Sequence, residues 1–196
     1  MVKRRSSNLT KIAVSVALEC DMNNNANYSI FCSRHGELHH TEHLLKNLAL
    51  KEDLSPTEFS QSVHNTAAGL YSIITNNQSP STAIAAGTDT FIYGLLEAST
   101  FLQCNPGQKV LVLSFDEPVP RIFGSVRDDY DSAYGAAFMF SDNASMPGIQ
   151  VNIDVQGGTD VDHTPVALQL IKFWQSSEVD ITVYTQNMSA RLRRYD

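Results

Sequence analysis

The segment KVLVLSFDE, residues 109–117, limits the possible folds more than any other stretch of the chain. Its apolar residues follow one another almost without a break, and Pro106-Gly107 and Pro118 bound the run. A strand with one face in water alternates apolar and polar residues, whereas an unbroken apolar run indicates a strand covered on both faces. The fold must therefore place packed layers on both sides of this strand.

Predicted helices and strands alternate along the chain, which indicates a layered α/β fold. The predicted helices cover residues 6–20, 38–48, 56–74 and 167–174, the predicted strands cover residues 28–34, 109–117, 132–142, 149–155 and 179–186, and a strand, a turn and a helix fill residues 79–103. No repeat or linker divides the sequence, so we expect one domain over residues 1–196. We expect its last segment, SARLRRYD, to be an exposed tail.

Two helical segments carry further local predictions. Ser55 is placed to cap a helix that begins at Pro56, because its hydroxyl can accept from the amide of Glu58. That helix should break near His64-Asn65, where side chains compete for backbone hydrogen bonds. In the preceding helix, helical spacing puts Leu44, Leu45 and Leu48 on one side.

Charge and hydropathy exclude several classes of protein. The chain has 196 residues, 42% of them hydrophobic, which is enough for a buried core. Fourteen basic and 21 acidic residues give a net charge of -7, which disfavours nucleic acid as a partner. No run approaches the ~20 apolar residues of a membrane span.

The cysteines and the N-terminus favour the cytoplasm. Cys20, Cys32 and Cys104 are odd in number and show no CxxC spacing, so they predict neither a disulfide framework nor a thiolate zinc site. A basic start precedes an apolar stretch, as in a signal peptide. Lys11 interrupts that stretch and no small-residue cleavage site follows cleanly, which argues against secretion.

The segment SPSTAIAAGTDTFIYGLLEAS, residues 79–99, predicts a strand, a sharp turn and a buried helix. A helix that starts at the end of a strand offers free amides and a positive dipole end, which suits a cysteine or serine nucleophile. The apex here is Ala85-Ala86-Gly87. We expect Thr88 or Asp89 to cap the amides that a nucleophile would otherwise use. From the pattern alone, an ordinary buried strand-turn-helix is the simplest interpretation.

Several blocks in order resemble a known family. FCSRHGEL, PTEFSQSVHNTAAGLYSI, STAIAAGTDTFIYGLLEA, KVLVLSFDEPVP and AYGAAFMF look like the N-terminal half of the β-ketoacyl synthases of the thiolase superfamily. They are most similar to the short ketosynthase-like proteins of bacterial aryl polyene pathways. The blocks extend from about residue 28 to about residue 175. The resemblance implies a thiolase-like layered half-fold, a mixed sheet flanked by helices, and no cofactor or metal.

The same resemblance bears on catalysis. Counting back from Gly94, which resembles the helix glycine of the family, the place of the nucleophilic cysteine falls on Ala86. The two histidines that support condensation would lie beyond the last residue of this sequence. Chain length factors resemble ketosynthases and also lack the cysteine. The resemblance therefore implies a non-catalytic subunit that binds and stabilises a catalytic ketosynthase, with the acyl carrier protein as a further partner.

Physical reasoning suggests what such a subunit offers its partner. A strand and helix end without a nucleophile can still complete a dimer interface and help to wall the partner's acyl tunnel. The residues that we expect in this interface or tunnel are Ala85, Ala86, Gly87, Asp89, Phe91 and Tyr93. Packing in the core is the competing fate of the aromatic members.

Two other functions stay open at this stage. The chain could be an active acyltransferase or hydrolase that uses Cys104, Ser81 or Asp89 as nucleophile, although Cys104 falls at the far end of the helix from the turn. It could also bind a metal through the cluster HGELHHTEH. That cluster contains His35, Glu37, His39, His40, Glu42 and His43.

The histidine cluster is more typical of a solvated helix face than of a metal site. His39 and His43 stand one helical turn apart, but the segment is not HExxH and a third ligand has no familiar spacing. His64, in SVHN, is more typical of a turn residue than of a catalytic base. Asp116 and Glu117 end the buried strand, where carboxylates are either catalytic or simply solvated.

Overall fold

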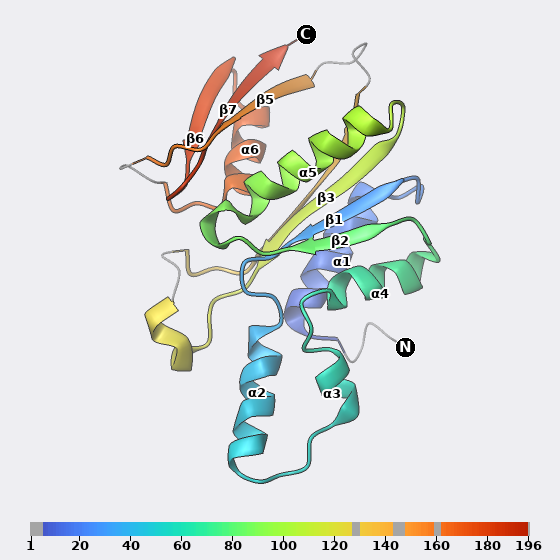
Figure 1. Ribbon diagram of the computed structural model, residues 1–196, viewed down its shortest axis with the longest axis vertical. Coiled ribbons are helices and arrows are strands. Elements are labelled where there is room, and N and C mark those ends of the chain that lie inside the picture. The colour runs from blue at the N-terminus through green and yellow to red at the C-terminus, as the bar shows by residue number, and fades with distance from the viewer. Residues whose placement is uncertain (1–5, 127–129, 143–147, 159–161, 196) are drawn as a thin grey trace.

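The computed structural model describes residues 6–126, 130–142, 148–158 and 162–195, with the side chains of Ser125 and Val126 left out (Figure 1). Two sheets and the helices between and beside them make up the chain. The first sheet has the order β2-β1-β3-β4. Its strands are β2 (Ser81–Ile84), β1 (Tyr28–Cys32), β3 (Lys109–Asp116) and β4 (Tyr134–Ser141). β1 runs parallel to β2 and β3, whereas β4 is antiparallel to β3, so the sheet is mixed as predicted.

The unbroken apolar run forms β3, and both of its faces are buried. Val110 and Val112 point into one core and Leu111, Leu113 and Phe115 into another, because successive side chains of a strand point to opposite faces. Helices α1 (Asn8–Cys20) and α4 (Thr66–Thr75) cover the second of these faces. Helix α5 (Thr90–Cys104) covers the first. The prediction of layers on both sides of this strand is confirmed.

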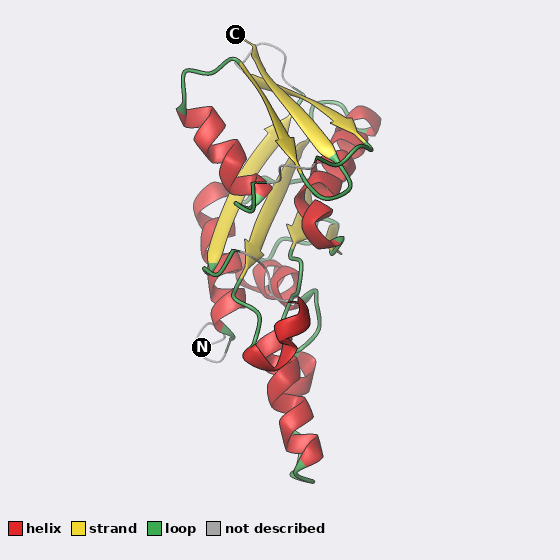
Figure 2. Cartoon of the chain, turned by 90° about the vertical axis from the view of Figure 1, so that its left-hand side faces the viewer, coloured by secondary structure: helices red, strands yellow, loops and turns green. Residues whose placement is uncertain are grey.

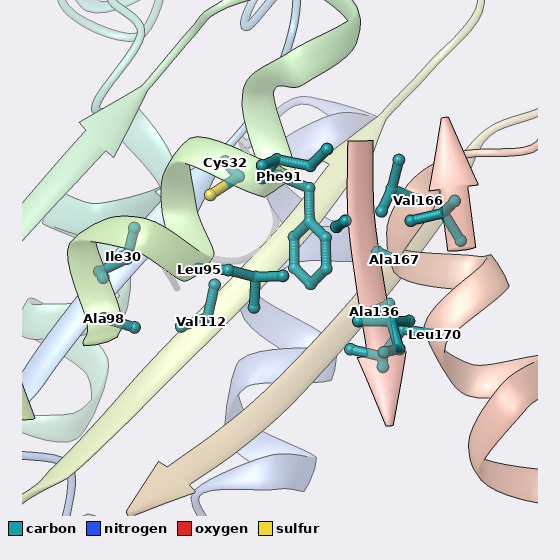
Figure 3. Packing of buried hydrophobic residues seen from close by; sticks show 14 of the residues in the cluster. Ile30, Cys32, Phe91, Leu95, Ala98, Val112, Ala136, Val166, Ala167 and Leu170 are labelled. Carbon is teal, nitrogen blue, oxygen red and sulfur yellow. The ribbon is translucent and has the colours of Figure 1, made fainter. Parts of the chain in front are cut away.

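A second sheet lies beyond α5. It contains β5 (Gly148–Asp154), β7 (Ser189–Tyr195) and β6 (Asp180–Tyr184) in the antiparallel order β5-β7-β6. Helix α6 (Val166–Gln175) lies next to α5, between the two sheets. Phe91 and Leu95 of α5 pack toward Ala167 and Leu170 of α6 (Figure 3). The layers are therefore helix, sheet, helix, sheet.

The prediction of an exposed tail at the C-terminus was wrong. Residues 189–195 form β7, the central strand of the second sheet, with Ala190 and Leu192 fully buried. Arg191 and Arg193 alternate with them and are exposed on the outer face. The other residues exposed on this face are Gln150, Asn152, Asp154, Asp180, Thr182, Tyr184 and Tyr195. The outer face is mostly polar, so the sheet requires no further apolar layer against it.

Residues 38–63 form a helical arm that extends away from the sheets (Figures 1 and 2). It contains α2 (Leu38–Ala49) and α3 (Pro56–Ser60). A short 3₁₀ segment, Arg121–Val126, follows β3 and is not part of the arm. The amide of Glu58 donates to Ser55 Oγ over 3.3 Å, as the capping pattern predicted. The break near His64-Asn65 is also confirmed, because α3 ends at Ser60 and α4 begins at Thr66. Within the described ranges, no helix has the length and apolar character needed to cross a bilayer.

Gly94 allows α5 to lie against β1. A Cβ at this position would stand 2.4 Å from Cys32 Sγ and 3.5 Å from Val112 Cγ1, so even alanine overpacks the core. We predict that Gly94→Ala lowers the free energy of unfolding by about 1–3 kcal/mol, measured by urea denaturation. Gly69→Ala in α4 is the control, because nothing lies within 4 Å of its Cβ and helix propensity should add up to about 1 kcal/mol. Equal stability of Gly94→Ala and wild type would contradict this packing.

Candidate functional site

The turn between β2 and α5 is the centre of the candidate site. β2 ends at Ile84, a 3₁₀ turn spans Gly87–Asp89, and α5 starts at Thr90. Gly87 has φ +58°, a left-handed conformation that a side chain would strain. Ala85 and Gly87 are exposed, and Ala86 is half-buried. The turn therefore presents backbone and methyl groups to the surface.

Thr90 closes this turn from within. The Ala86 amide donates to Thr90 Oγ1 over 2.9 Å, and the same hydroxyl donates to the Gly87 carbonyl over 2.7 Å. We expected Thr88 or Asp89 to cap these amides, and the structure assigns that role to Thr90 instead. Because the Ala86 amide already has an acceptor, it is not available to stabilise an oxyanion.

Asp89 connects the turn to the second sheet. Its side chain is 4% exposed, and its carboxylate accepts from Thr185 Oγ1 and, over 2.8 Å, from Asn187 Nδ2. Thr185 Oγ1 also accepts from the Met188 amide, which fixes the loop between β6 and β7. This contact joins residues that lie almost one hundred positions apart in the sequence. Asp89 therefore ties the turn, at the edge of the first sheet, to the loop between β6 and β7 of the second sheet.

A polar cavity of about 170 Å³ opens beside the turn. Six parts of the chain line it: the loop after β1, the turn with the start of α5, the end of β3, residues 130–134, residues 162–166, and the end of β6 with the loop after it. Lining residues include Arg34, Gly87, Thr88, Asp116, Glu117, Tyr134, His163, Thr185 and Gln186. Thr88 Oγ1 is buried, and none of the described residues forms a hydrogen bond with it. The cavity contains hydroxyl, carboxyl and imidazole groups but no cysteine.

Asp116 has a structural task at the edge of the cavity. Its carboxylate accepts from Ser33 Oγ over 2.8 Å and from the Arg34 amide over 3.0 Å, and Tyr134 donates to it over 3.4 Å. Burial raises the pKa of Asp116, and the hydrogen bonds from residues 33–35 partly oppose that shift. The strand-end carboxylate thus fixes the loop after β1.

Comparison with known proteins agrees with this architecture. The sequence pattern of the β-ketoacyl synthase N-terminal domain matches residues 1–194. The chain belongs to this family. The match reaches beyond residue 175, where the sequence resemblance was expected to end, and includes β6 and nearly all of β7. No curated protein sequence matches the chain.

The chain is similar in structure to chains of two solved ketosynthase complexes. In the complex of the ketosynthase ApeO with its chain length factor ApeC from Xenorhabdus doucetiae, one chain matches with a TM-score of 0.87 and 28% identity, over 99% of this chain and 80% of that one. The ishigamide ketosynthase/chain length factor matches with a TM-score of 0.60 and 17% identity, over 76% of this chain and 50% of that one. The second likeness is one of fold alone.

The other nucleophile candidates of the sequence are Ser81 and Cys104, and neither lines the cavity beside the turn. Ser81 is exposed at the start of β2. Cys104 is exposed at the end of α5, about 20 Å from the turn by helical rise. Cys32 is buried under α5, and burial raises the pKa of its thiol, which disfavours the thiolate.

His39, His43 and His64 each contact a different group of the chain. His39 Nε2 donates to the Pro118 carbonyl over 2.8 Å, and His43 Nδ1 lies 3.6 Å from Glu58 Oε2. Within the ranges that the structure describes, no three His, Cys, Asp or Glu side chains are grouped to hold a metal ion. His64 Nε2 donates to the Ser33 carbonyl over 2.8 Å, which agrees with the turn role that the sequence favoured.

The expected interface residues divide into two groups. Ala85, Ala86, Gly87 and Tyr93 reach the surface, with Tyr93 44% exposed. Asp89 and Phe91 face the interior, with exposed fractions of 4% and 3%. Sequence reasoning did not find Thr90, Thr185 or Asn187. The segment TQNM is typical of a tight turn, but nothing in it indicates contact with Asp89.

We predict that Asp89→Asn lowers the free energy of unfolding by about 1–3 kcal/mol, because the amide cannot accept from both Thr185 and Asn187. Urea denaturation measures the change. Asp180→Asn is the control, since the Asp180 pair with Arg191 is exposed on the outer face and its loss should change stability little. A stability of Asp89→Asn equal to that of the control would contradict the role assigned to Asp89.

We also predict an order of thiol reactivity. With iodoacetamide at pH 8, Cys104 should react first and Cys20 slowly, because burial raises the pKa of Cys20 and so lowers its thiolate fraction. Cys32 should react only in denaturant. Peptide mass mapping assigns each adduct, and Cys104→Ser should remove the fast phase. Rapid labelling of Cys32 in the folded protein would contradict its burial.

Proposed function

We propose that this chain is a non-catalytic, chain-length-factor-like subunit that binds and stabilises a catalytic β-ketoacyl synthase. The pair would act in the cytoplasm on chains carried by an acyl carrier protein, in polyene, polyketide or fatty-acid-like elongation. The likeness to a chain of the ApeO–ApeC complex supports this proposal. In it, residues 1–196 act as one ketosynthase-like N-terminal domain.

The observation that carries the proposal is the turn at Ala86. We propose that Ala86 stands where a catalytic ketosynthase has its cysteine. Acyl transfer needs a nucleophile at this point and free donors for the oxyanion. Ala86 supplies a methyl group, and its amide donates to Thr90. The turn thus lacks the reactive atom and one of the donors that such a site would use.

The edge of the first sheet is the proposed docking surface for the ketosynthase. β2 is an outer strand, and no strand in the described ranges pairs with its second edge. Open backbone groups on an edge strand can pair with a strand of another chain. Tyr93 and Leu96 of α5 are each 44% exposed, and Ile73 of α4 is 69% exposed. α5 and α4 lie on either side of β2 (Figure 1).

We use the name β2 edge surface for strand β2 together with Ala85, Ile73, Tyr93 and Leu96. Its small residues let a partner backbone approach closely, and its larger apolar side chains supply buried area on association. Ala85, Ala86 and Gly87 would then lie next to the ketosynthase. From there this subunit could help to wall the acyl tunnel of its partner.

Co-expression with the ketosynthase encoded nearest to this chain tests the proposal. Size-exclusion chromatography with mass determination should find a stable mixed complex, and the ketosynthase alone should be less soluble or less active. A well-behaved monomer that ignores the ketosynthase would contradict the proposed function.

Within that complex, we predict that Leu96→Glu weakens association about tenfold or more, because it buries an unpaired carboxylate at the interface. Val179→Glu is the matched control. Val179 is 60% exposed but directly precedes β6 of the second sheet, so it is not part of the β2 edge surface. Binding measured by biolayer interferometry should distinguish the two. Equal loss in both variants, or none in either, would contradict the β2 edge surface.

A further inference from the structure

The arm, residues 38–63, exposes large apolar side chains along its length. In α2, Leu44 is the one described residue that is buried, and α3 contains none. The exposed apolar residues of the arm are Leu45 (52%), Leu48 (60%), Leu50 (68%), Leu54 (39%), Phe59 (63%) and Val63 (45%). Helical spacing put Leu44, Leu45 and Leu48 on one side of α2, and of these three only Leu44 is buried. Apolar surface concentrated in this way indicates a protein interaction site.

The base of the arm is held firmly, so the arm is a preformed element. His64 Nε2 donates to the Ser33 carbonyl, and the His64 ring packs so closely on Gly36 that a Cβ there would stand 2.8 Å from it. Asp116 fixes Ser33 and the Arg34 amide. His39 donates to the Pro118 carbonyl. A docking element whose position is already fixed loses little conformational entropy when it binds.

The charges of the arm narrow its possible occupants. It contains four carboxylates, Glu42, Glu52, Asp53 and Glu58, against the ammonium groups of Lys46 and Lys51. This net negative charge disfavours nucleic acid, an anionic membrane surface and an acidic protein. A protein partner with an apolar surface is the occupant that fits.

We propose that the arm is a second docking element for the ketosynthase, in addition to the β2 edge surface. This inference rests on the proposed function. The chain of the ApeO–ApeC complex matches 99% of this chain, which leaves too few residues unmatched to omit the arm. The matched span therefore includes the arm, and the matched chain belongs to a complex that contains a ketosynthase. In the proposed complex, Leu50 and Phe59 enter apolar contacts with the partner.

Binding of arm variants to the purified ketosynthase tests this inference. Leu50→Asp and Phe59→Asp should each weaken binding about tenfold or more, because each places a charge in an apolar contact. Both positions are more than 60% exposed, so the variants should fold, which circular dichroism checks. Leu50→Met should bind like wild type. Val155→Asp is the matched control, since Val155 is 80% exposed and lies after β5.

Hydrogen–deuterium exchange gives a second measurement that needs no substitution. Amides of residues 45–63 should exchange more slowly in the complex than in the free chain. If wild type binds the ketosynthase and the arm variants bind equally well, the docking role of the arm is wrong while the proposed function stands. If wild type does not bind, both are wrong. Self-association of the free chain that Leu50→Asp abolishes would assign the arm to a second copy instead, and would overturn the inference.

Discussion

Burial of α5 between the two sheets is the constraint on which the rest of the structure depends. Its residues Phe91, Ile92, Leu95 and Ala98 pack into one core with both sheets and α6 (Figure 3). The helix can lie this close to β1 only because Gly94 leaves room for Cys32. Once α5 is fixed, the turn before it has a fixed position too. The geometry of the candidate site follows from helix packing.

At that position, the Ala86 amide and the Asp89 carboxylate bond to other groups of the chain itself. The Ala86 amide donates a hydrogen bond to the Thr90 hydroxyl. The Asp89 carboxylate accepts hydrogen bonds from Thr185 and Asn187, in the loop between β6 and β7. A catalytic turn keeps donors free for the substrate, whereas here the Ala86 amide is bonded within the turn itself. The same contacts leave Ala85 and Gly87 at the surface beside the open edge of β2. The bonded Ala86 amide and the open edge of β2 are the two features on which the proposed binding role rests.

The sequence predicted much of the fold because its strongest signals are local. The apolar run of β3, the cap at Ser55 and the break before Thr66 each depend on a few neighbouring residues. β7 was missed because its arginines suggest solvent, although Ala190 and Leu192 alternate with them as in a half-buried strand. Charge on one face of a strand hides the apolar character of the other.

The missed parts of the candidate site depend on distant contacts. The bond between Asp89 and Thr185 follows from how two sheets stack, which no local pattern encodes. The exposure of Leu45 and Leu48 was missed for the same reason. Helical spacing predicts that the two residues share a side of the helix, but it does not predict whether another part of the protein covers that side.

The central claim is that this subunit takes part in chain elongation without forming a covalent intermediate. Intact mass spectrometry of its complex with the ketosynthase, after incubation with an acyl-carrier-protein thioester, tests that claim most directly. We predict that the acyl adduct appears on the ketosynthase and that this chain keeps its unmodified mass. An acyl adduct on this chain in the native complex would contradict the account.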